Sequence, residues 1–342
     1  MRRVLAAAFA LVVFTPFARA ADAVSITKGD GVIEFKVNGN VVSRYHVAPA
    51  VVKPYLWPII APNGAAVTRS WPMEAPKPGE TTDHPHQKSA WFCHGDVIPE
   101  GLDLKTKTLD KGGKGVDFWS ESVKDGQKRH GRIVVTKVGE PKQVAPNHAS
   151  ITTWNDWVSP DGVKVMDEER TLHLIALPQG RLYVWDIDLH AGVAPITFGD
   201  TKEGSFGVRV NDVIRLANKD GNGVVTNAKG TSAKAPMKEP LPVWGYISDW
   251  NDYSGTIDGK TAGIAVFDDP KNPRPAWHTR AYGLMAANPF GRAHAAFPDT
   301  KTVTEPVKIA KDGHLKLRYG IYAHDGDVAA GKVAETYETF KK

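Results

Sequence analysis

Alternating apolar and polar positions run through most of the chain and predict β-strands. Residues 31–47, GVIEFKVNGNVVSRYHV, alternate on both sides of Asn38 and Gly39, a pair that favours a tight hairpin turn. Residues 149–190 predict three successive strands with turns at 159–162 and 178–180. In the middle strand the period of two places four residues on one face, Arg170, Leu172, Leu174 and Ala176, and three on the other, Thr171, His173 and Ile175.

Later segments have the same character, among them GIAVFDD at 263–269 and HLKLRYGIYAH at 314–324. Only residues 328–340 show apolar spacing typical of a helix. Many strands, one short helix and no break in composition predict an all-β protein with one large antiparallel β-sandwich domain at 21–342. Three long loops rich in Pro and Gly, 53–90, 97–118 and 196–260, carry most of the unusual residues, and such loops often carry function.

The first twenty residues have a different pattern. Arg2 and Arg3 precede an apolar run that ends at Phe17, and Ala18-Arg19-Ala20 follows as a small-x-small cleavage site. This is typical of a secretory signal peptide, so we expect residues 1–20 to be removed and the protein to be periplasmic or secreted. No later segment approaches the roughly 18 consecutive apolar residues of a membrane span.

The net charge does not indicate a nucleic-acid partner, and the cysteine content excludes stabilisation by a disulfide within the chain. Without the three arginines of residues 1–20 the formal net charge of +5 falls to +2, and no dense Lys/Arg cluster indicates a nucleic-acid surface. The single cysteine, Cys93, cannot form a disulfide within the chain, so the fold must depend on its core. Cys93 is either a small buried side chain or part of a site.

The densest titratable cluster is TTDHPHQKSAWFCHGD at 81–96. Pro85 favours an extended conformation at His84, which would direct His84 and His86 to the same side. Asp83 could orient an imidazole by accepting its second N–H. His94 and Asp96 repeat the i, i+2 spacing. Two histidines and a third ligand could also hold a divalent metal ion, although no established metal motif is present.

Two further stretches contain candidate acid–base groups. In KEGSFGVR at 202–209, Glu203 is a candidate base and Arg209 a candidate clamp for an anion or a hydroxyl group; a structural ion pair is the alternative. In residues 263–291, His278 and Arg280 stand two apart and would face one cavity. Trp277, beside them, could stack on a sugar ring or fill the core.

Together these stretches resemble a known bacterial family. DHPHQKSAWFCHGDV, GVDFW at 115–119, EGSFGVR, WNDYSG at 250–255 and FDDPKNPRPAWHTRAYGLMAANPFG resemble proteins labelled PmoA or "methane oxygenase PmoA", whose function is unknown. The sequence departs from the family pattern at Gln87, where a third histidine is common, and at Asp269. The resemblance implies a fold similar to galactose mutarotase and a setting in carbohydrate degradation. Methane oxidation is not expected, because a membrane oxygenase subunit needs several apolar spans.

The leading hypothesis is an exported carbohydrate-active enzyme, an epimerase, lyase or hydrolase, that acts by general acid–base chemistry without a required cofactor. A non-catalytic glycan-binding protein and a metal-assisted sugar enzyme are the alternatives. The candidate catalytic residues are His84, His86, Glu203 and His278. The candidate substrate-binding residues are Asp83, Trp91, His94, Asp96, Trp119, Arg209, Trp277 and Arg280.

Overall fold

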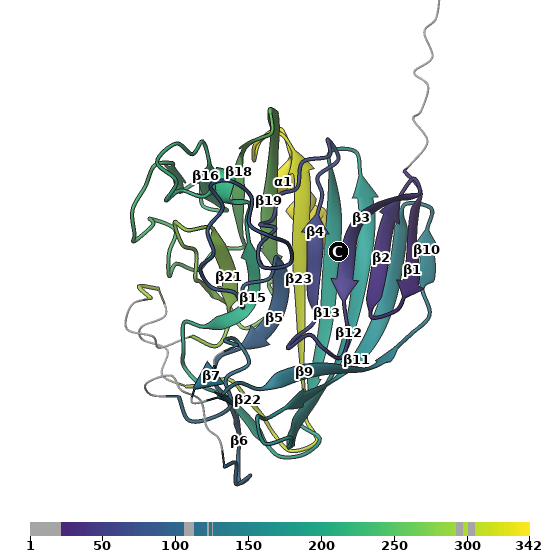
Figure 1. Cartoon of the computed structure of the whole chain (residues 1–342), viewed down its shortest axis with the longest axis vertical. Helices are drawn as coiled ribbons and strands as arrows, with labels where there is room; N and C mark the ends of the chain where they lie inside the picture. Colours follow the sequence, from purple (N-terminus) through teal and green to yellow (C-terminus); the bar gives the residue numbers. More distant parts are fainter. Residues whose placement is uncertain (1–21, 106–112, 122, 125, 292–296, 300–304) are drawn as a thin grey trace, which may run out of the picture.

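A computed structural model describes residues 22–105, 113–121, 123–124, 126–291, 297–299 and 305–342. The expected signal peptide therefore lies outside the described residues. Two large antiparallel sheets stack face to face, as Figure 1 shows for β1–β4 in front of β11–β13. The prediction of an all-β antiparallel sandwich is confirmed.

The first sheet has eight strands. In spatial order they are β1 (Val24–Gly29), β2 (Val32–Val37), β3 (Asn40–His46), β4 (Tyr55–Ile59), β5 (Ala90–His94), β15 (Gly204–Arg209), β21 (Leu284–Asn288) and β20 (Ala276–Trp277). The expected hairpin is β2 and β3, joined at Asn38 and Gly39, whose φ angles of 51° and 79° suit a tight turn.

The second sheet has ten strands. Nine follow one another as β10 (Lys142–Ala145), β11 (His148–Val158), β12 (Lys164–Leu177), β13 (Gly180–His190), β23 (His314–Asp325), β19 (Lys260–Asp268), β18 (Trp250–Ile257), β16 (Val224–Asn227) and β17 (Ser232–Lys234), and β9 (Arg132–Val138) pairs with β11. The predicted three-strand unit is β11–β12–β13. Its middle strand buries Arg170, Leu172, Leu174 and Ala176, as the period of two required.

The remaining elements are small. They are the three-stranded sheet β22 (Lys308–Ile309), β14 (Ile196–Phe198) and β6 (Val97–Pro99), the pair β7 (Val123–Lys124) and β8 (Gln127–Lys128), the 3-10 turn η1 (Asp212–Ile214) and the helix α1 (Val333–Phe340). Among the described residues, no helix is long and apolar enough to cross a membrane.

Two local expectations were wrong. The helix starts at Val333, five residues later than its apolar spacing indicated, because Lys332 has a left-handed φ of 53° that interrupts it. Several strands, including β15, lie where long loops were expected. The six residues of β15 are all buried, so the strand lacks the alternation by which half-buried strands are recognised.

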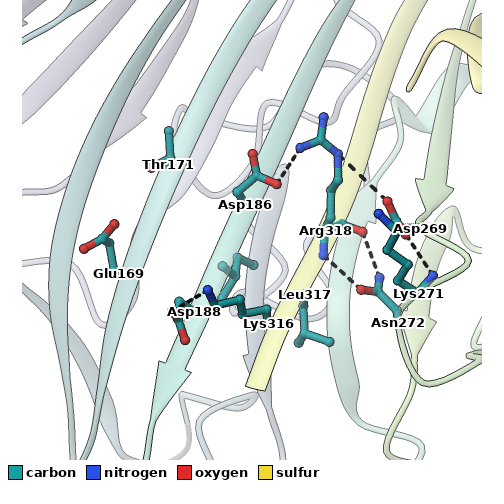
Figure 2. A pocket seen from close by; sticks show the side chains of 11 residues that line it. Glu169, Thr171, Asp186, Asp188, Asp269, Lys271, Asn272, Lys316, Leu317 and Arg318 are labelled. Atoms are coloured by element: carbon teal, nitrogen blue, oxygen red, sulfur yellow. Dashed lines mark hydrogen bonds and ion pairs between the residues drawn. The ribbon is translucent and has the colours of Figure 1, made fainter. Parts of the chain in front are cut away.

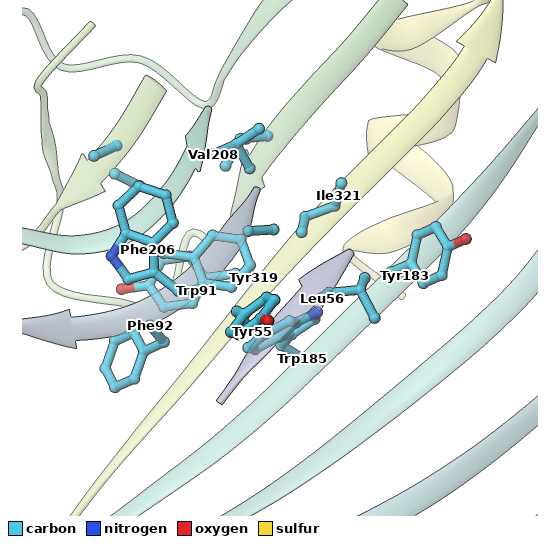
Figure 3. Packing of buried hydrophobic residues seen from close by; sticks show 14 of the residues in the cluster. Tyr55, Leu56, Trp91, Phe92, Tyr183, Trp185, Phe206, Val208, Tyr319 and Ile321 are labelled. Carbon is cyan, nitrogen blue, oxygen red and sulfur yellow. The ribbon is translucent and has the colours of Figure 1, made fainter. Parts of the chain in front are cut away.

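Aromatic side chains fill the space between the two sheets (Figure 3). The Phe206 ring lies 5.2 Å from that of Trp185 and stacks at 4.6 Å on that of Tyr319. Each fully buried aromatic or aliphatic side chain stabilises the fold by roughly 1.5–3 kcal/mol. Because Phe206 points inward from β15, the neighbouring odd-numbered positions, including Arg209, face away from the second sheet. That outer side carries the candidate site.

A buried ion pair in the second sheet links stability to pH. His324 Nε2 lies 2.8 Å from Asp252 Oδ2, and both side chains are fully buried. Burial alone would lower the pKa of His324, but the carboxylate of Asp252 outweighs it and raises that pKa above its usual value. The pair therefore stabilises the fold fully below about pH 6.5, and this contribution is lost as pH rises through the raised folded-state pKa.

We expect Asp252→Asn to destabilise the protein by about 3–5 kcal/mol in mildly acidic solution, because it leaves a buried imidazolium unpaired. The loss should shrink as pH rises and His324 becomes neutral. Urea unfolding of both proteins from pH 5.5 to 9 measures the difference. A difference that stays constant over this range would contradict the assigned linkage.

Candidate active site

A cavity of about 510 Å³ lies on the side of the first sheet that faces away from the second sheet. Four segments far apart in the sequence meet there: the β4–β5 loop, the loop after β6, the β14–β15 loop and the β20–β21 turn. Side chains of His84, His86, Glu203, His278, Arg280 and Trp119, all singled out from the sequence, line this one cavity. The tertiary structure thus brings imidazole, carboxylate and guanidinium groups together.

His84 is held in an unusual conformation. Its φ is 46°, in the left-handed region, rather than in the extended region expected before Pro85. Hydrogen bonds to its carbonyl oxygen fix this geometry, one from Arg69 Nη2 at 3.2 Å and one from the backbone N–H of Gln87 at 2.9 Å. A non-glycine residue with positive φ is strained, and such residues concentrate at functional sites.

The His84 imidazole forms a dyad with Asp83. Nδ1 of His84 lies 2.9 Å from Oδ2 of Asp83. An ionised carboxylate can only accept, so Nδ1 carries the proton and donates it. The second ring nitrogen, Nε2, then remains to exchange a proton with a molecule in the cavity. The orienting role predicted for Asp83 matches this geometry.

Asp83 is kept ionised by two buried guanidinium groups. Its Oδ1 accepts hydrogen bonds from Arg69 Nη1 and Arg209 Nη2, both at 2.7 Å. Partial burial alone would raise the pKa of Asp83, but the hydrogen bond from His84 and the charge of Arg209 hold that pKa well below its usual range. The carboxylate therefore stays available to accept from His84 across the physiological pH range.

Tyr282 fixes the plane of the His84 ring. The two rings stack with their centroids 4.8 Å apart and their planes 10° from parallel. The guanidinium of Arg209 lies 4.7 Å from the centre of the Tyr282 ring, and that of Arg280 lies 5.5 Å from it. Burial raises the pKa of Tyr282 to about 12, so the phenol stays neutral and acts as a packing surface and hydrogen-bonding group.

His86 has a different electrostatic setting. Its ring meets that of His84 edge-on at 5.7 Å. Burial lowers the pKa of His86 to about 3, with further lowering by the charges of Lys53 and His84. The imidazole is therefore neutral at any physiological pH. It can donate or accept a hydrogen bond in the cavity, but it does not hold an acidic proton there.

Glu203 supplies one carboxylate of the cavity. Its side chain forms an ion pair with that of Lys202. Its backbone approaches Gly95 closely, with the Gly95 N–H donating to the Glu203 carbonyl oxygen at 2.8 Å. A Cβ at position 95 would lie 2.9 Å from the Cβ of Glu203, so only glycine allows this approach without displacement.

The β20–β21 turn adds His278 and Arg280. Trp244 Nε1 donates to His278 Nδ1 at 3.2 Å, and the His278 side chain is nearly buried. Because Nδ1 of His278 accepts, a neutral His278 ring carries its proton on Nε2, whereas His84 carries its proton on Nδ1. Arg280 donates from Nε to Glu239 Oε1 at 2.9 Å, which fixes the guanidinium at the cavity edge.

Five of the predicted substrate-binding residues are not available to a substrate, and their role is corrected to a structural one. Trp91 and Trp277 are fully buried, and Trp277 Nε1 donates to the Ser248 carbonyl oxygen. His94 is fully buried, with Nε2 2.8 Å from the Gly199 carbonyl oxygen, and burial lowers its pKa to about 4. Asp96 accepts from the backbone N–H groups of Lys114 and Gly115. Arg209 is fully buried, bonding Asp83 and Gln87 Oε1.

Several lining residues were not predicted. Tyr282 continues the 278, 280 spacing, so the period of two that linked His278 and Arg280 could have included it. Lys202 adjoins Glu203 in sequence. Asp117 accepts from the backbone N–H groups of Trp119 and Ser120, which shapes the loop that carries Trp119. Arg69, in the β4–β5 loop, had no sequence signal, because its link to Asp83 exists only in the folded chain.

Metal ligation was an open alternative. Among the described residues, no group of three or more His, Cys, Asp or Glu side chains is placed to hold a metal ion. Cys93, whose role was left open, is fully buried on β5, and burial raises the pKa of its thiol to about 12. It is therefore a packing residue and does not reach the cavity.

Comparison with protein families identifies one match. The model of DUF6807, a family of unknown function, matches residues 32–338. The sequence motifs resemble proteins labelled PmoA, but the description of the matching family does not carry that label. No functionally curated protein sequence matches the chain.

Comparison with solved structures finds matches of low sequence identity. A galactose mutarotase-like protein from Clostridium acetobutylicum is 10% identical, with a TM-score of 0.41 over 90% of this chain and 100% of that one. An α-galactosidase from Lactobacillus brevis is 8% identical, with a TM-score of 0.41 over 90% of this chain. The α-galactosidase AgaB from Geobacillus stearothermophilus is 7% identical, with a TM-score of 0.44 over 90% of this chain. The chain spans 40% and 42% of the two α-galactosidases. At such identities and TM-scores these matches say nothing of a reaction.

Proposed function

The chain belongs to the DUF6807 family, and we propose that it is a carbohydrate-active enzyme that works by general acid–base chemistry in the cavity around His84. The observation that carries the proposal is the Asp83–His84 dyad facing the same cavity as Glu203. A fixed imidazole and a separate carboxylate are the two groups that proton transfer to and from a sugar requires.

His84 is the first proton-transfer group. When Nε2 takes a proton from a substrate hydroxyl group or C–H bond, the resulting imidazolium is stabilised by Asp83, in the manner of other His–Asp pairs. When Nε2 returns the proton, the dyad regains its starting state. Arg69 and Arg209 are positioning residues, because they hold Asp83 without lining the cavity themselves. Tyr282 lines the cavity and also positions the His84 ring by stacking on it.

Glu203 is the opposing group. It accepts or donates the complementary proton, so that a proton removed at one end of the substrate is balanced by one delivered at the other. Oxygen atoms of the substrate are bound by the neutral imidazoles of His86 and His278 and by the charged guanidinium of Arg280. Polar groups of this number on several sides suit a sugar, whose hydroxyl groups both donate and accept. Epimerisation, elimination and glycoside hydrolysis all use this pair of proton transfers.

The non-catalytic glycan-binding alternative is less favoured by the geometry. It relied on Trp91, Trp119 and Trp277 as flat surfaces for sugar rings, and their side chains are at most 1% exposed. Export to the periplasm or the medium remains part of the proposal and rests on the sequence of residues 1–20 alone.

The test is a screen of the purified protein against neutral and acidic monosaccharides, their lactones and aryl glycosides. Epimerisation is followed by NMR, elimination by absorbance of the unsaturated product, and hydrolysis by release of the aglycone. We expect turnover in one of these classes that is lost in Glu203→Gln. A sugar that binds the cavity but is never converted, with binding unaffected by Glu203→Gln, would instead support the glycan-binding alternative.

A further inference from the structure

The outer face of the ten-stranded sheet carries a second polar feature, on the opposite side of the sandwich from the candidate active site. Two rows of side chains cross β11, β12, β13 and β23 in direct register. We call these eight residues the outer strip. The first row is Trp154, Glu169, Asp188 and Lys316, and the second is Thr152, Thr171, Asp186 and Arg318. At the usual spacing of strands, each row is roughly 15 Å long.

Most of the outer strip, all of its residues but Thr152 and Trp154, lines a hollow of about 310 Å³ (Figure 2). The turn at 269–272 forms its side wall and is fastened to β23. Asn272 Nδ2 donates to the Arg318 carbonyl oxygen at 2.8 Å, and the Arg318 N–H donates to Asn272 Oδ1 at 3.0 Å. The hollow is therefore built on a rigid sheet and an anchored turn.

Donors and acceptors alternate around the hollow. Arg318 Nη1 donates to Asp186 Oδ1 at 2.7 Å, and Arg318 Nε lies 4.0 Å from Asp269 Oδ2. Asp188 Oδ1 lies 2.8 Å from His314 Nδ1, and its Oδ2 lies 3.9 Å from Lys316 Nζ. Four carboxylates and three cationic side chains line the hollow in all, so its charge is nearly balanced. Such a surface offers little net attraction to an ion, but it offers many paired hydrogen-bonding groups.

One feature of the outer strip costs stability. Glu169 stands directly opposite Asp188 across β12 and β13, and like charges in this position are destabilising. Among the described residues no ion pair engages Glu169, whose side chain accepts only from Trp154 Nε1 at 2.9 Å. The next row shows that the sheet can avoid this cost. There Asp156 opposes Asp167, and Lys164 pairs with both carboxylates.

We propose that the outer strip is a second, non-catalytic binding site for a neutral oligosaccharide. Sugar hydroxyl groups donate to Glu169 and Asp188 and so relieve their repulsion, and they also accept from Lys316 and Arg318. The hollow holds one sugar unit, and the rows across the strands accommodate its neighbours. A carboxylate pair that is kept at a cost to stability is typical of a binding surface. The proposal does not depend on the chemistry assigned to the other face.

The test compares Glu169→Gln/Asp188→Asn with wild type by calorimetric titration of cellohexaose, mannohexaose and xylohexaose at neutral pH. We expect at least one hexasaccharide to bind wild type and to bind the double variant about tenfold more weakly, since hydrogen bonds to charged groups are the stronger ones. The single variant Glu169→Gln should melt about 1–2 °C higher, because it removes the like charge opposite Asp188 and breaks no ion pair of the described residues.

Asp156→Asn is the matched control. It changes a neighbouring carboxylate on the same sheet face outside the outer strip, and it should leave binding unchanged without raising the melting temperature. His84→Gln should also retain full binding, which separates this site from the cavity on the other face. Binding that is equal in the double variant, lost in His84→Gln, restricted to an oligogalacturonate probe, or absent for all three hexasaccharides would overturn the proposal.

Discussion

Replacing His84 by Gln is expected to lower kcat/KM on the sugar that the protein converts by about 10²–10⁴-fold, the usual contribution of a positioned acid–base group. Glutamine keeps a polar side chain in the cavity but cannot carry a proton to and from the substrate. Because Asp83 retains its hydrogen bonds from Arg69 and Arg209, the fold around the dyad should survive the change. Steady-state kinetics on the substrate found in the screen measures the effect.

Two other histidine variants are the comparisons for the loss of kcat/KM in His84→Gln. His86→Gln should cost about tenfold at most, the equivalent of one hydrogen bond, because His86 is neutral and its pKa is lowered to about 3 by burial. His148→Gln, on β11 of the other sheet, should leave kcat/KM unchanged. If His84→Gln and His86→Gln reduced the rate equally, the assignment of proton transfer to the Asp83–His84 dyad would fail.

Breaking the ion pair between Glu168 and Arg170 is expected to cost about 3–5 kcal/mol of unfolding free energy. Both side chains are fully buried between the sheets. Arg170 Nη1 also donates to the Tyr45 hydroxyl at 2.7 Å, and Glu168 Oε2 accepts from Trp157 Nε1 at 2.7 Å. Glu168→Gln leaves a guanidinium in the core without a counter-charge, and arginine cannot escape this by losing its proton.

Urea unfolding monitored by tryptophan fluorescence measures this loss. The double variant Glu168→Gln/Arg170→Met should lose less than the sum of its two single variants, because it removes both charges together. Glu338→Gln, which breaks the exposed pair with Lys341, is the control and should change stability by less than about 1 kcal/mol. Additive losses in the double variant would show that the two charges do not depend on each other.

Much of the fold could be predicted from the sequence because strands with one buried face are encoded locally. The β2–β3 hairpin follows from Asn38-Gly39 between alternating segments, and β11, β12 and β13 follow from long alternating runs. β5 and β15 could not be recognised in this way. Both faces of these strands are covered, so all of their residues are buried and no polar face marks the period.

The candidate site, like the fold, could be predicted only in part from the sequence. The spacing of two placed His278 with Arg280 on one side, and both line the cavity. His84 and His86 also line it, but through a left-handed conformation at His84 that the spacing did not predict. The same spacing was wrong for His94 and Asp96, which serve the packing of β5 and the loop at 113–119. Trp91, Trp119 and Trp277 look alike in sequence, yet only Trp119 lines the cavity. Nothing local distinguishes a tryptophan in the core from one in a site.

The sequence by itself determined which side chains with acid–base chemistry the protein has and which of its strands alternate. Only the tertiary structure decided that residues near 84, 119, 203 and 280 share one cavity and that Arg69 and Arg209 converge on Asp83. It also decided that Glu169 faces Asp188 with no cation paired to both carboxylates among the described residues. The physical reason is the separation along the chain over which each interaction acts. Strand periodicity and turn preference act between residues a few positions apart, whereas ion pairs, ring stacking and the burial that shifts a pKa depend on which distant segments fold together.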